Sequence, residues 1–228
     1  MKFINILVFI LFLGISTSCQ SFTRKKVAVV EEGNKATYKQ LDKQNLSKYE
    51  TAYFASGCFW CVEAIFESVK GVKEVISGYS GGKEKNPTYE QVGGGMTSHA
   101  EAVKIYYDPK VISFTALVQV FFGSHDPTSL NRQGPDRGRQ YRSVAFYKNE
   151  TEKKIISDYI SLLKSENIYD GAPITTEVTA FEKFYIAEDY HQDYERNNPN
   201  NSYIRNVSVP RLNRFKENFG DYLKDNAH

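Results

Sequence analysis

A short strand followed directly by a cysteine-bearing helix is the sequence feature that most limits how this chain can fold. Residues 51–56 are typical of a strand, and apolar side chains recur at helical spacing from Val62 to Val69. Between them lies Gly57-Cys58-Phe59-Trp60-Cys61, which holds two of the three cysteines and the only tryptophan. A second strand is predicted over Val72 to Tyr79. The folded part of the chain therefore begins as strand–helix–strand.

Cys58 lies at the predicted strand-to-helix junction, where free backbone N–H groups and the helix dipole favour negative charge. We therefore expect its thiol to have a lowered pKa and to act as a nucleophile. Cys61 follows one helical turn later, where Cβ atoms are about 5–6 Å apart, so a small adjustment could close a disulfide. Taken alone, a C-x-x-C pair is also compatible with inert buried thiols or with half of a zinc site.

The N-terminus has the features of an export signal. Lys2 precedes the apolar run Phe3 to Ile15, and Ser16-Thr17-Ser18 leads directly to Cys19. This arrangement predicts a signal peptide over residues 1–18 rather than a membrane-spanning helix. A cysteine directly after small residues resembles a bacterial lipoprotein cleavage site, which would make Cys19 the lipidated N-terminus; a simple signal with a free Cys19 is the alternative. Both hypotheses place the protein in the bacterial periplasm or cell envelope. In the lipoprotein hypothesis, the lipid anchor is its only membrane attachment.

Composition separates the signal from the folded part. Residues 19–48 are rich in Lys, Glu, Asn and Gln, which predicts a flexible tether. We expect the main domain over residues 49–208 and a C-terminal helical extension over residues 209–228, with a helix from Val209 to Leu223. The net charge is +2, with basic and acidic residues interspersed, so no nucleic-acid-binding surface is predicted. We expect a monomer.

Helices and strands alternate through the main domain. The long irregular stretch from Ser124 to Gln140 indicates a functional loop, and Thr88 and Ser113 are expected as helix N-caps. Helices are predicted over residues 59–70, 89–92, 114–122 and 150–164, and further strands over 99–107, 141–147, 175–178 and 184–185. This pattern predicts an α+β two-layer sandwich, a mixed β-sheet with helices packed on it and a ferredoxin-like core.

Glu101 has an unusual position in the predicted strand over residues 99–107. Alternation places it on the same face as Val103, Ile105 and Tyr107, which is the apolar face. A carboxyl group directed into a core is costly unless it is paired or protonated. The alternative is that Glu101 lies at the end of the strand and reaches water, and the spacing alone favours this alternative.

Several motifs occur in a fixed order along the chain. They are Gly57-Cys58-Phe59-Trp60, Gly78-Tyr79-Ser80-Gly81-Gly82, Asn86-Pro87-Thr88-Tyr89, His99-Ala100-Glu101, His125-Asp126-Pro127-Thr128, Gln140-Tyr141-Arg142-Ser143 and Ala187-Glu188-Asp189-Tyr190-His191-Gln192. From about Tyr53 to Pro199, the chain resembles peptide methionine sulfoxide reductases of the A type. The resemblance is specific because all these separate blocks agree in order.

The resemblance implies reduction of the S epimer of methionine sulfoxide, free or in proteins, without a metal or organic cofactor. It assigns the nucleophile to Cys58, and the binding and protonation of the sulfoxide oxygen to Tyr89, Glu101 and Tyr141. A sulfoxide sulfur is a poor electrophile until its oxygen is protonated, and an inward-facing Glu101 would stay protonated and could act as the acid. Attack would leave a sulfenic acid on Cys58.

The resemblance also implies a substrate pocket. Phe59 and Trp60 match the residues that hold the methyl group of the substrate in apolar surroundings. Asp136 matches an acidic residue near the site, and His191 belongs to the tyrosine–histidine block of the family.

Cys61 distinguishes this chain from the common pattern of the family. The frequent resolving cysteines of the family lie near the C-terminus, and this chain has no cysteine after Cys61. We expect Cys61 to condense with the sulfenic acid on Cys58, giving a disulfide that a thioredoxin-like dithiol reduces. The alternative is a one-cysteine cycle in which an outside thiol attacks the sulfenic acid. The helix over Val209 to Leu223 could replace the missing cysteine-bearing segment.

Two other functions compete with this hypothesis. A general disulfide oxidoreductase follows from C-x-x-C alone, but it leaves the two tyrosines and the glutamate unexplained. A zinc-binding module would use both cysteines and two of the histidines His99, His125 and His191. The chain has no second C-x-x-C and no H-x-x-x-H pair, so zinc binding is the weakest of the three hypotheses.

Overall fold

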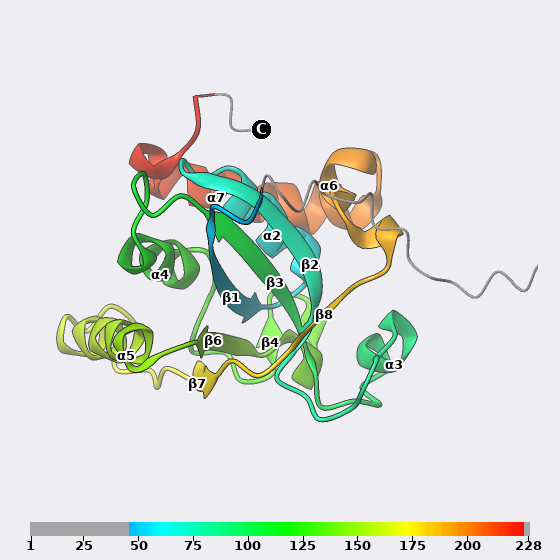
Figure 1. The fold of residues 1–228 in the computed structure, drawn as a ribbon, viewed down its shortest axis with the longest axis horizontal. Helices are drawn as coiled ribbons and strands as arrows, with labels where there is room; N and C mark the ends of the chain where they lie inside the picture. The colour runs from blue at the N-terminus through cyan, green and yellow to red at the C-terminus, as the bar shows by residue number, and fades with distance from the viewer. Residues whose placement is uncertain (1–45, 226–228) are drawn as a thin grey trace, which may run out of the picture. The chain divides into compact units, whose positions relative to one another are not determined.

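The computed structural model describes residues 46–225 (Figure 1). The predicted signal peptide, Cys19 and most of the predicted tether lie outside these residues. The helices are α2 (Phe59–Glu67), α3 (Tyr89–Gly93), α4 (Phe114–Gly123), α5 (Glu150–Ser165), α6 (Tyr194–Asn197) and α7 (Val209–Asn218). The strands are β1 (Glu50–Ser56), β2 (Val72–Ser80), β3 (Ala100–Tyr107), β4 (Arg132–Gln133), β5 (Asp136–Arg137), β6 (Ser143–Tyr147), β7 (Glu177–Ala180) and β8 (Phe184–Ile186). In this range, no helix has the length and apolar character needed to cross a bilayer.

Within residues 46–225, six strands form one sheet in the order β7-β6-β1-β3-β2-β8, and β4 pairs with β5 in a separate hairpin. The neighbours β6, β1, β3 and β2 are antiparallel, whereas β7 is parallel to β6. The connection β1–α2–β2–β3–α4–β6 in the spatial order β6-β1-β3-β2 is the ferredoxin-like split βαβ arrangement. The predicted α+β fold with a mixed sheet is confirmed.

Different elements cover the two faces of the sheet. On one face, Phe54 of β1 stacks against Phe66 of α2 and Phe121 of α4, with ring centroids 5.6 and 4.7 Å away. On the other face, Tyr53 stacks on Phe181, in the connection between β7 and β8, at 3.8 Å. Figure 1 shows α4 and α5 together at one edge of this unit and α3 at the opposite edge. Because both faces are covered, alternate residues of the central strands are buried on both sides.

The ends of the helices follow local capping chemistry. The Thr88 hydroxyl accepts a hydrogen bond from the Gln91 N–H, and the Ser113 hydroxyl accepts one from the Ala116 N–H, so both predicted N-caps are confirmed. Helix α2 ends at Glu67, before the predicted Lys70. The reason is tertiary: the Lys70 N–H donates to the Tyr222 carbonyl (2.7 Å) instead of continuing the helix.

Two other boundaries differ from the sequence-based prediction. Tyr141 was expected to begin a strand, but it ends a 3-10 turn, because its N–H donates to the Gly138 carbonyl (3.0 Å). Strand β7 begins at Glu177 rather than Thr175, because the Thr175 N–H and hydroxyl both donate to the Pro127 carbonyl. Each of these partners comes from another segment or turn, which a periodic pattern does not reveal.

The C-terminal segment packs on the rest of the fold. Helix α7 contacts α2, and its chain continues into a 3-10 turn at Gly220–Tyr222 rather than extending as a helix to Leu223. A β-carbon on Gly123 would lie 1.9 Å from the Phe219 ring, so glycine is what allows this ring to pack on the end of α4. The Tyr222 hydroxyl donates to Gln119 of α4 (2.5 Å). The segment over residues 209–223 is thus anchored on two helices.

Candidate active site

The site is built where β1 turns into α2. Gly57 has φ +86°, and a β-carbon there would lie 2.6 Å from the Gln133 β-carbon, so only glycine suits the turn. The next residue, Cys58, is the N-cap of α2 and is 6% exposed. Strand β1 is paired on both sides, with β3 and β6, and this pairing fixes the position of the cysteine.

Glu101 lies directly against the start of α2. Its carboxylate accepts a hydrogen bond from the Phe59 N–H (3.0 Å), one of the N–H groups that a helix start leaves free. The side chain is 1% exposed, and burial raises its pKa to about 8, against the opposing effect of that hydrogen bond. The alternative in which Glu101 reaches water is wrong because α2 covers this end of β3. At neutral pH the group is a buried carboxylic acid.

Two tyrosines share the surroundings of Glu101 and Cys58. Tyr89 begins α3 and Tyr141 ends the 3-10 turn at Arg139–Tyr141, and both are half-buried. Burial, together with the charges of Glu101 and Cys58, raises the pKa of both hydroxyls, to about 12 for Tyr89. The structure therefore brings the predicted nucleophile, acid and two hydroxyl donors together from four separate elements.

Glu188 supports one of these tyrosines. Its carboxylate accepts hydrogen bonds from the Tyr89 N–H (2.9 Å) and the Tyr79 hydroxyl (2.8 Å). The sequence analysis placed Glu188 and Tyr79 in motifs without giving either residue a role. Glu188 lies 99 positions from Tyr89 along the chain, so only the fold reveals the contact.

An aromatic cluster borders the start of α2. Phe59 is buried, and Trp60 stacks on Tyr194 with ring centroids 3.7 Å apart. The Trp60 indole N–H donates to Nδ1 of His191 (3.1 Å), whose ring also lies 4.2 Å from the Tyr89 ring. Burial lowers the pKa of His191 to about 4, so the ring is neutral and carries its proton on Nε2. Together these rings give the apolar surroundings that a substrate methyl group requires.

Cys61 faces a different set of groups. Its sulfur lies 3.7 Å from the Tyr203 hydroxyl, which also donates to the Asp136 carboxylate (2.6 Å). The Ser208 hydroxyl and the Arg211 guanidinium both stabilise negative charge on this sulfur. Tyr203 precedes a π-helical turn at Ile204–Ser208, which leads directly into α7. The C-terminal segment thus supplies most of the surroundings of Cys61.

The two thiols are free, and their pKa values move in opposite directions. Burial, with the neighbouring Cys61, raises the pKa of Cys58 well above its usual value. The hydrogen bond from Cys58, together with the charge of Arg211, lowers the pKa of Cys61 to about 6 against the effect of burial. The predicted lowering of the Cys58 pKa is therefore wrong, because desolvation of the covered helix start outweighs the helix dipole. The hydrogen bond between the two thiols favours the proton on Cys58 and negative charge on Cys61.

The sequence analysis missed three residues around Cys61: Tyr203, Ser208 and Arg211. The one available signal was the spacing of Ser208 and Arg211, which are three apart and so share a helix face. Nothing in the local pattern indicated that this face would meet α2. Asp136, which the resemblance placed near the site, is brought there by the β4–β5 hairpin.

The three histidines considered as zinc ligands are spread over different environments. His99 accepts from the Gly82 N–H, and His125 bonds the Phe121 carbonyl and the Ser143 hydroxyl. Between residues 46 and 225, no group of three or more His, Cys, Asp or Glu side chains is placed to hold a metal ion.

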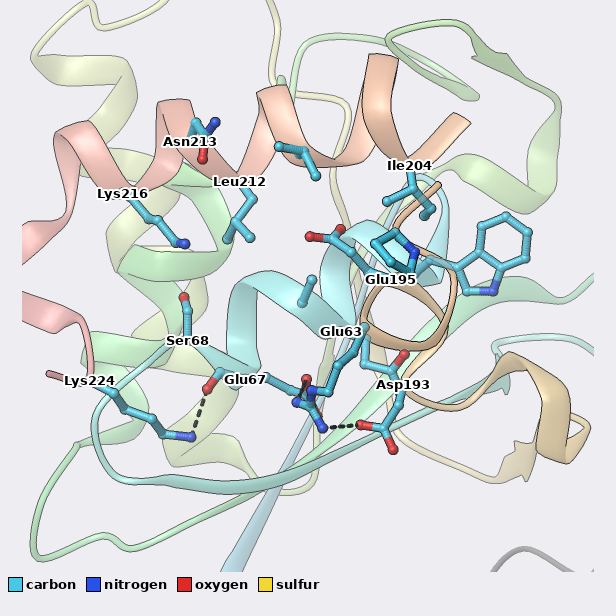
Figure 2. A pocket seen from close by; sticks show the side chains of 15 residues that line it. Glu63, Glu67, Ser68, Asp193, Glu195, Ile204, Leu212, Asn213, Lys216 and Lys224 are labelled. Carbon is cyan, nitrogen blue, oxygen red and sulfur yellow. Dashed lines mark hydrogen bonds and ion pairs between the residues drawn. The ribbon is translucent and has the colours of Figure 1, made fainter. Parts of the chain in front are cut away.

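A cavity of about 640 Å³ lies between α2, α6 and α7. Its lining includes Trp60 but neither cysteine, and also excludes Glu101 and the two tyrosines of the site. Figure 2 shows Glu63 and Glu67 of α2 in this cavity, with Asp193 opposite them. Because Glu63 and Cys61 project from nearly opposite sides of α2, this cavity is separate from the thiol site.

The sequence was compared with protein families and with known proteins. The family model for peptide methionine sulfoxide reductase matches residues 50–223. The chain belongs to this family. The match extends beyond the range from Tyr53 to Pro199 on which the resemblance was based, and it includes the C-terminal segment. Membership confirms the predicted activity, thiol-dependent reduction of methionine sulfoxide.

Individual relatives agree with the family match. The peptide methionine sulfoxide reductase MsrA 1 of Rhodopirellula baltica is 52% identical over 175 residues, which cover 77% of this chain and 90% of the relative. The enzyme MsrA of Deinococcus radiodurans is 46% identical over 175 residues, which cover 77% of this chain and 84% of the relative.

Solved structures of the family have the same fold. Reduced Mxr1 of Saccharomyces cerevisiae is 34% identical with a TM-score of 0.63, and the match covers 68% of this chain and 88% of that protein. Methionine sulfoxide reductase A of Corynebacterium diphtheriae is 34% identical with a TM-score of 0.61, and the match covers 67% of this chain and 76% of that protein.

Proposed function

We propose that this peptide methionine sulfoxide reductase acts on the S epimer of methionine sulfoxide, free or in proteins, with Cys58 as nucleophile and Cys61 as resolving cysteine. The observation that carries the proposal is the buried acid at the start of α2. Glu101 is protonated at neutral pH and hydrogen-bonded to the residue next to Cys58. Thiol–disulfide exchange has no oxygen to protonate, whereas a sulfoxide must have its oxygen protonated before a thiol attacks its sulfur.

The first step transfers oxygen from the substrate to Cys58. The proton on Cys58 passes to the Cys61 thiolate, and the Cys58 sulfur attacks the sulfoxide sulfur while Glu101 protonates the oxygen. Tyr89 and Tyr141 donate hydrogen bonds to that oxygen. The attack forms a sulfur–sulfur bond to the substrate. Hydroxide then leaves the substrate sulfur and attacks the Cys58 sulfur, and the sulfur–sulfur bond breaks, so methionine leaves reduced by two electrons and Cys58 becomes a sulfenic acid. The rings of Phe59 and Trp60 hold the methyl group.

The second step forms a disulfide. Cys61 gives its proton to the sulfenic hydroxyl, its thiolate attacks the Cys58 sulfur, the sulfur–oxygen bond breaks and water leaves. An external dithiol of the thioredoxin type then reduces the disulfide and returns both thiols. The two residues are three apart on α2, so their sulfurs can pair without rearrangement of the fold. Asp136 and His191 act by holding Tyr203 and Trp60 in place.

The test is reduction of the separated S and R epimers by the wild type and by Cys61→Ser. We expect turnover of the S epimer alone with dithiothreitol, because a small thiol can reduce the sulfenic acid directly. With a thioredoxin-type reductant, Cys61→Ser should lose most of its turnover. Full turnover by that variant would show that Cys61 does not resolve Cys58. Turnover of neither epimer by folded wild type would favour a disulfide oxidoreductase.

We further propose that the protein is an exported monomer. In this proposal, residues 1–18 are removed, Cys19 carries the lipid, residues 19–48 are a tether, residues 49–208 are the reductase domain and residues 209–228 are its helical extension. The support is the order of basic, apolar and small residues before Cys19. Mass spectrometry of the protein from a bacterial envelope should find a lipidated Cys19. An unmodified N-terminus beyond residue 19 would contradict it.

A further inference from the structure

Arg211 is a buried cation without a carboxylate at ion-pair distance. Its side chain is 7% exposed, and its Nε donates to the Ser124 carbonyl (2.8 Å) while Nη2 donates to the Ser56 hydroxyl (3.3 Å). Within the described residues 46–225, no Asp or Glu oxygen lies within 4.0 Å of it. A buried charge is costly unless another charge compensates it. The position of Arg211 therefore calls for a negative group that is not a directly paired carboxylate.

Two acidic groups interact electrostatically with this guanidinium beyond ion-pair distance. They are the Asp136 carboxylate and the Cys61 sulfur. Arg211 favours the charged form of both, although burial leaves the pKa of Asp136 raised. The guanidinium also reaches the junction of β1 and α2, where Nη1 lies 3.4 Å from the place that a β-carbon on Gly57 would occupy. Arg211 is thus located beside the segment that carries both cysteines.

The helical segment that supplies Arg211 separates two environments. Figure 2 shows Leu212 and Asn213 of α7 facing the cavity between α2, α6 and α7. Arg211 instead reaches Ser56 and Ser124. Ser208 lies three positions earlier on the same helical face, which explains why both residues act on Cys61.

We propose that Arg211 is a positioning residue for disulfide formation, which holds the Cys61 sulfur as a thiolate directed at Cys58. This inference rests on the proposed role of Cys61 as resolving cysteine. The thiolate, not the thiol, attacks a sulfenic acid, so a fixed positive charge beside Cys61 keeps the attacking species present at neutral and mildly acid pH.

The balance of charges around Cys61 supports this assignment. Cys58 contributes a neutral donor to Cys61, whereas Glu101 opposes a second negative charge when it is ionised. The Ser208 hydroxyl lies beside the sulfur, and its proton goes to the Glu195 carboxylate. Arg211 is the cation of this set, so its removal should have a larger effect on the thiolate than removal of any one hydroxyl.

The experiment compares Arg211→Gln with Arg211→Lys in the full chain. Both replacements retain a hydrogen-bond donor for Ser124 and Ser56, but only lysine retains the charge. One equivalent of S-methionine sulfoxide is added to reduced enzyme without a reductant. Samples are quenched over time with a sulfenic-acid trap, and mass spectrometry then counts sulfenic acid and disulfide while chromatography counts methionine.

We expect the pH midpoint of disulfide formation to rise by about one unit in Arg211→Gln, so the rate at about pH 5 falls about tenfold. Arg211→Lys should stay within about threefold of the wild type, because it keeps the charge. Methionine release in the same experiment at about pH 7 should change by no more than about twofold in either variant. That release also shows that the variant is folded and binds substrate.

Three outcomes would overturn the inference. The first is an unchanged midpoint in Arg211→Gln, and the second is an equal shift in Arg211→Lys and Arg211→Gln, which would indicate a purely structural role. The third concerns the thiolate itself. The Cys58→Ser variant keeps a hydroxyl donor beside Cys61, so the absorbance of the Cys61 thiolate can be titrated in it. When Arg211→Gln is added to this variant, the titration should move to higher pH. The Cys58→Ser/Cys61→Ser variant serves as the blank. An unchanged titration would contradict the inference.

Failure of the proposed function would give a different result. If Cys61 does not resolve Cys58, the wild type itself forms no Cys58–Cys61 disulfide in the single-turnover experiment. If only the role of Arg211 is wrong, the wild type forms this disulfide and Arg211→Gln forms it at the same rate and with the same pH dependence.

Discussion

The two cysteines of α2 are three residues apart, yet they face opposite chemical environments. Cys58 lies among groups that give protons to a substrate: Glu101 from β3, Tyr89 from α3 and Tyr141 from the turn before β6. We call this set the acid side. Most of the surroundings of Cys61 come from one contiguous stretch, residues 203–211, which supplies two hydroxyls and a guanidinium. We call this set the thiolate side.

The difference shows how one site can carry out two unlike steps. On the acid side, burial raises the pKa of Glu101 to about 8, which keeps a proton available for the sulfoxide oxygen. On the thiolate side, hydrogen bonds and a positive charge lower the pKa of Cys61 to about 6, although this residue is equally buried. Opposite shifts of neighbouring groups are a common basis for assigning acid and base roles. Variants on the two sides should therefore affect different steps.

The largest expected effect comes from replacing each of the two cysteines in turn. Cys58→Ser should lower turnover by at least about 10³-fold, because the nucleophile is removed. Cys61→Ser should still release one equivalent of methionine in a single turnover, and it should accumulate the sulfenic acid. Chromatography of methionine and mass spectrometry of the protein measure both. Equal loss of methionine release in the two variants would contradict the assignment of separate steps to the two sides.

Glu101→Gln should have the next largest effect. We expect methionine release to fall about 10²- to 10⁴-fold, because the general acid is lost. In the wild type, the acid is present below its folded pKa, so the rate of this step should fall as pH rises through about 8. The pH dependence of single-turnover methionine release measures this.

Glu152→Gln is the matched control for this variant. Glu152 is also buried, but it serves the start of α5, where its carboxylate accepts from the Lys148 N–H. Its replacement should reduce stability without changing the pH profile of the first step. A fall in rate above about pH 8 that persists in Glu101→Gln would identify another acid.

Removal of one tyrosine hydroxyl on the acid side should have an intermediate effect. Tyr89→Phe and Tyr141→Phe should each slow methionine release about 5- to 30-fold, equivalent to about 1–2 kcal/mol for one hydrogen bond to a developing charge. The rate of disulfide formation should not change, because neither hydroxyl contacts Cys61. Slower disulfide formation in either variant would mean that the two sides are not independent.

The smallest effect is expected on the thiolate side. Tyr203→Phe removes the donor to Asp136 and the contact with the Cys61 sulfur. It should slow disulfide formation by no more than about fivefold and reduce the free energy of unfolding by about 1 kcal/mol, with methionine release unchanged. Tyr222→Phe is the control, because it removes a similar hydrogen bond, to Gln119, outside the site. Slower disulfide formation in this control would indicate that loosening the C-terminal segment is sufficient.

Local patterns in the sequence determined much of the fold. The strand–helix–strand beginning, the caps at Thr88 and Ser113 and the alternation along β3 all follow from neighbouring residues at fixed periods. These patterns, with the order of the motifs, also determined the family, the nucleophile and the set of groups on the acid side. They placed Glu101 on the apolar face but did not decide whether it reaches water.

Only the tertiary structure decided the electrostatics of the site. Whether Glu101 is buried depends on α2 covering the end of β3, and the pKa of Cys58 depends on how much water the assembled helix start excludes. The cation beside Cys61 comes from Arg211, whose partner Ser56 lies 155 positions away. A pKa depends on the dielectric and on charges from every nearby segment. The spacing of residues along the chain does not show which distant segments come close together in the fold. The thiolate side could therefore be recognised only in the folded molecule.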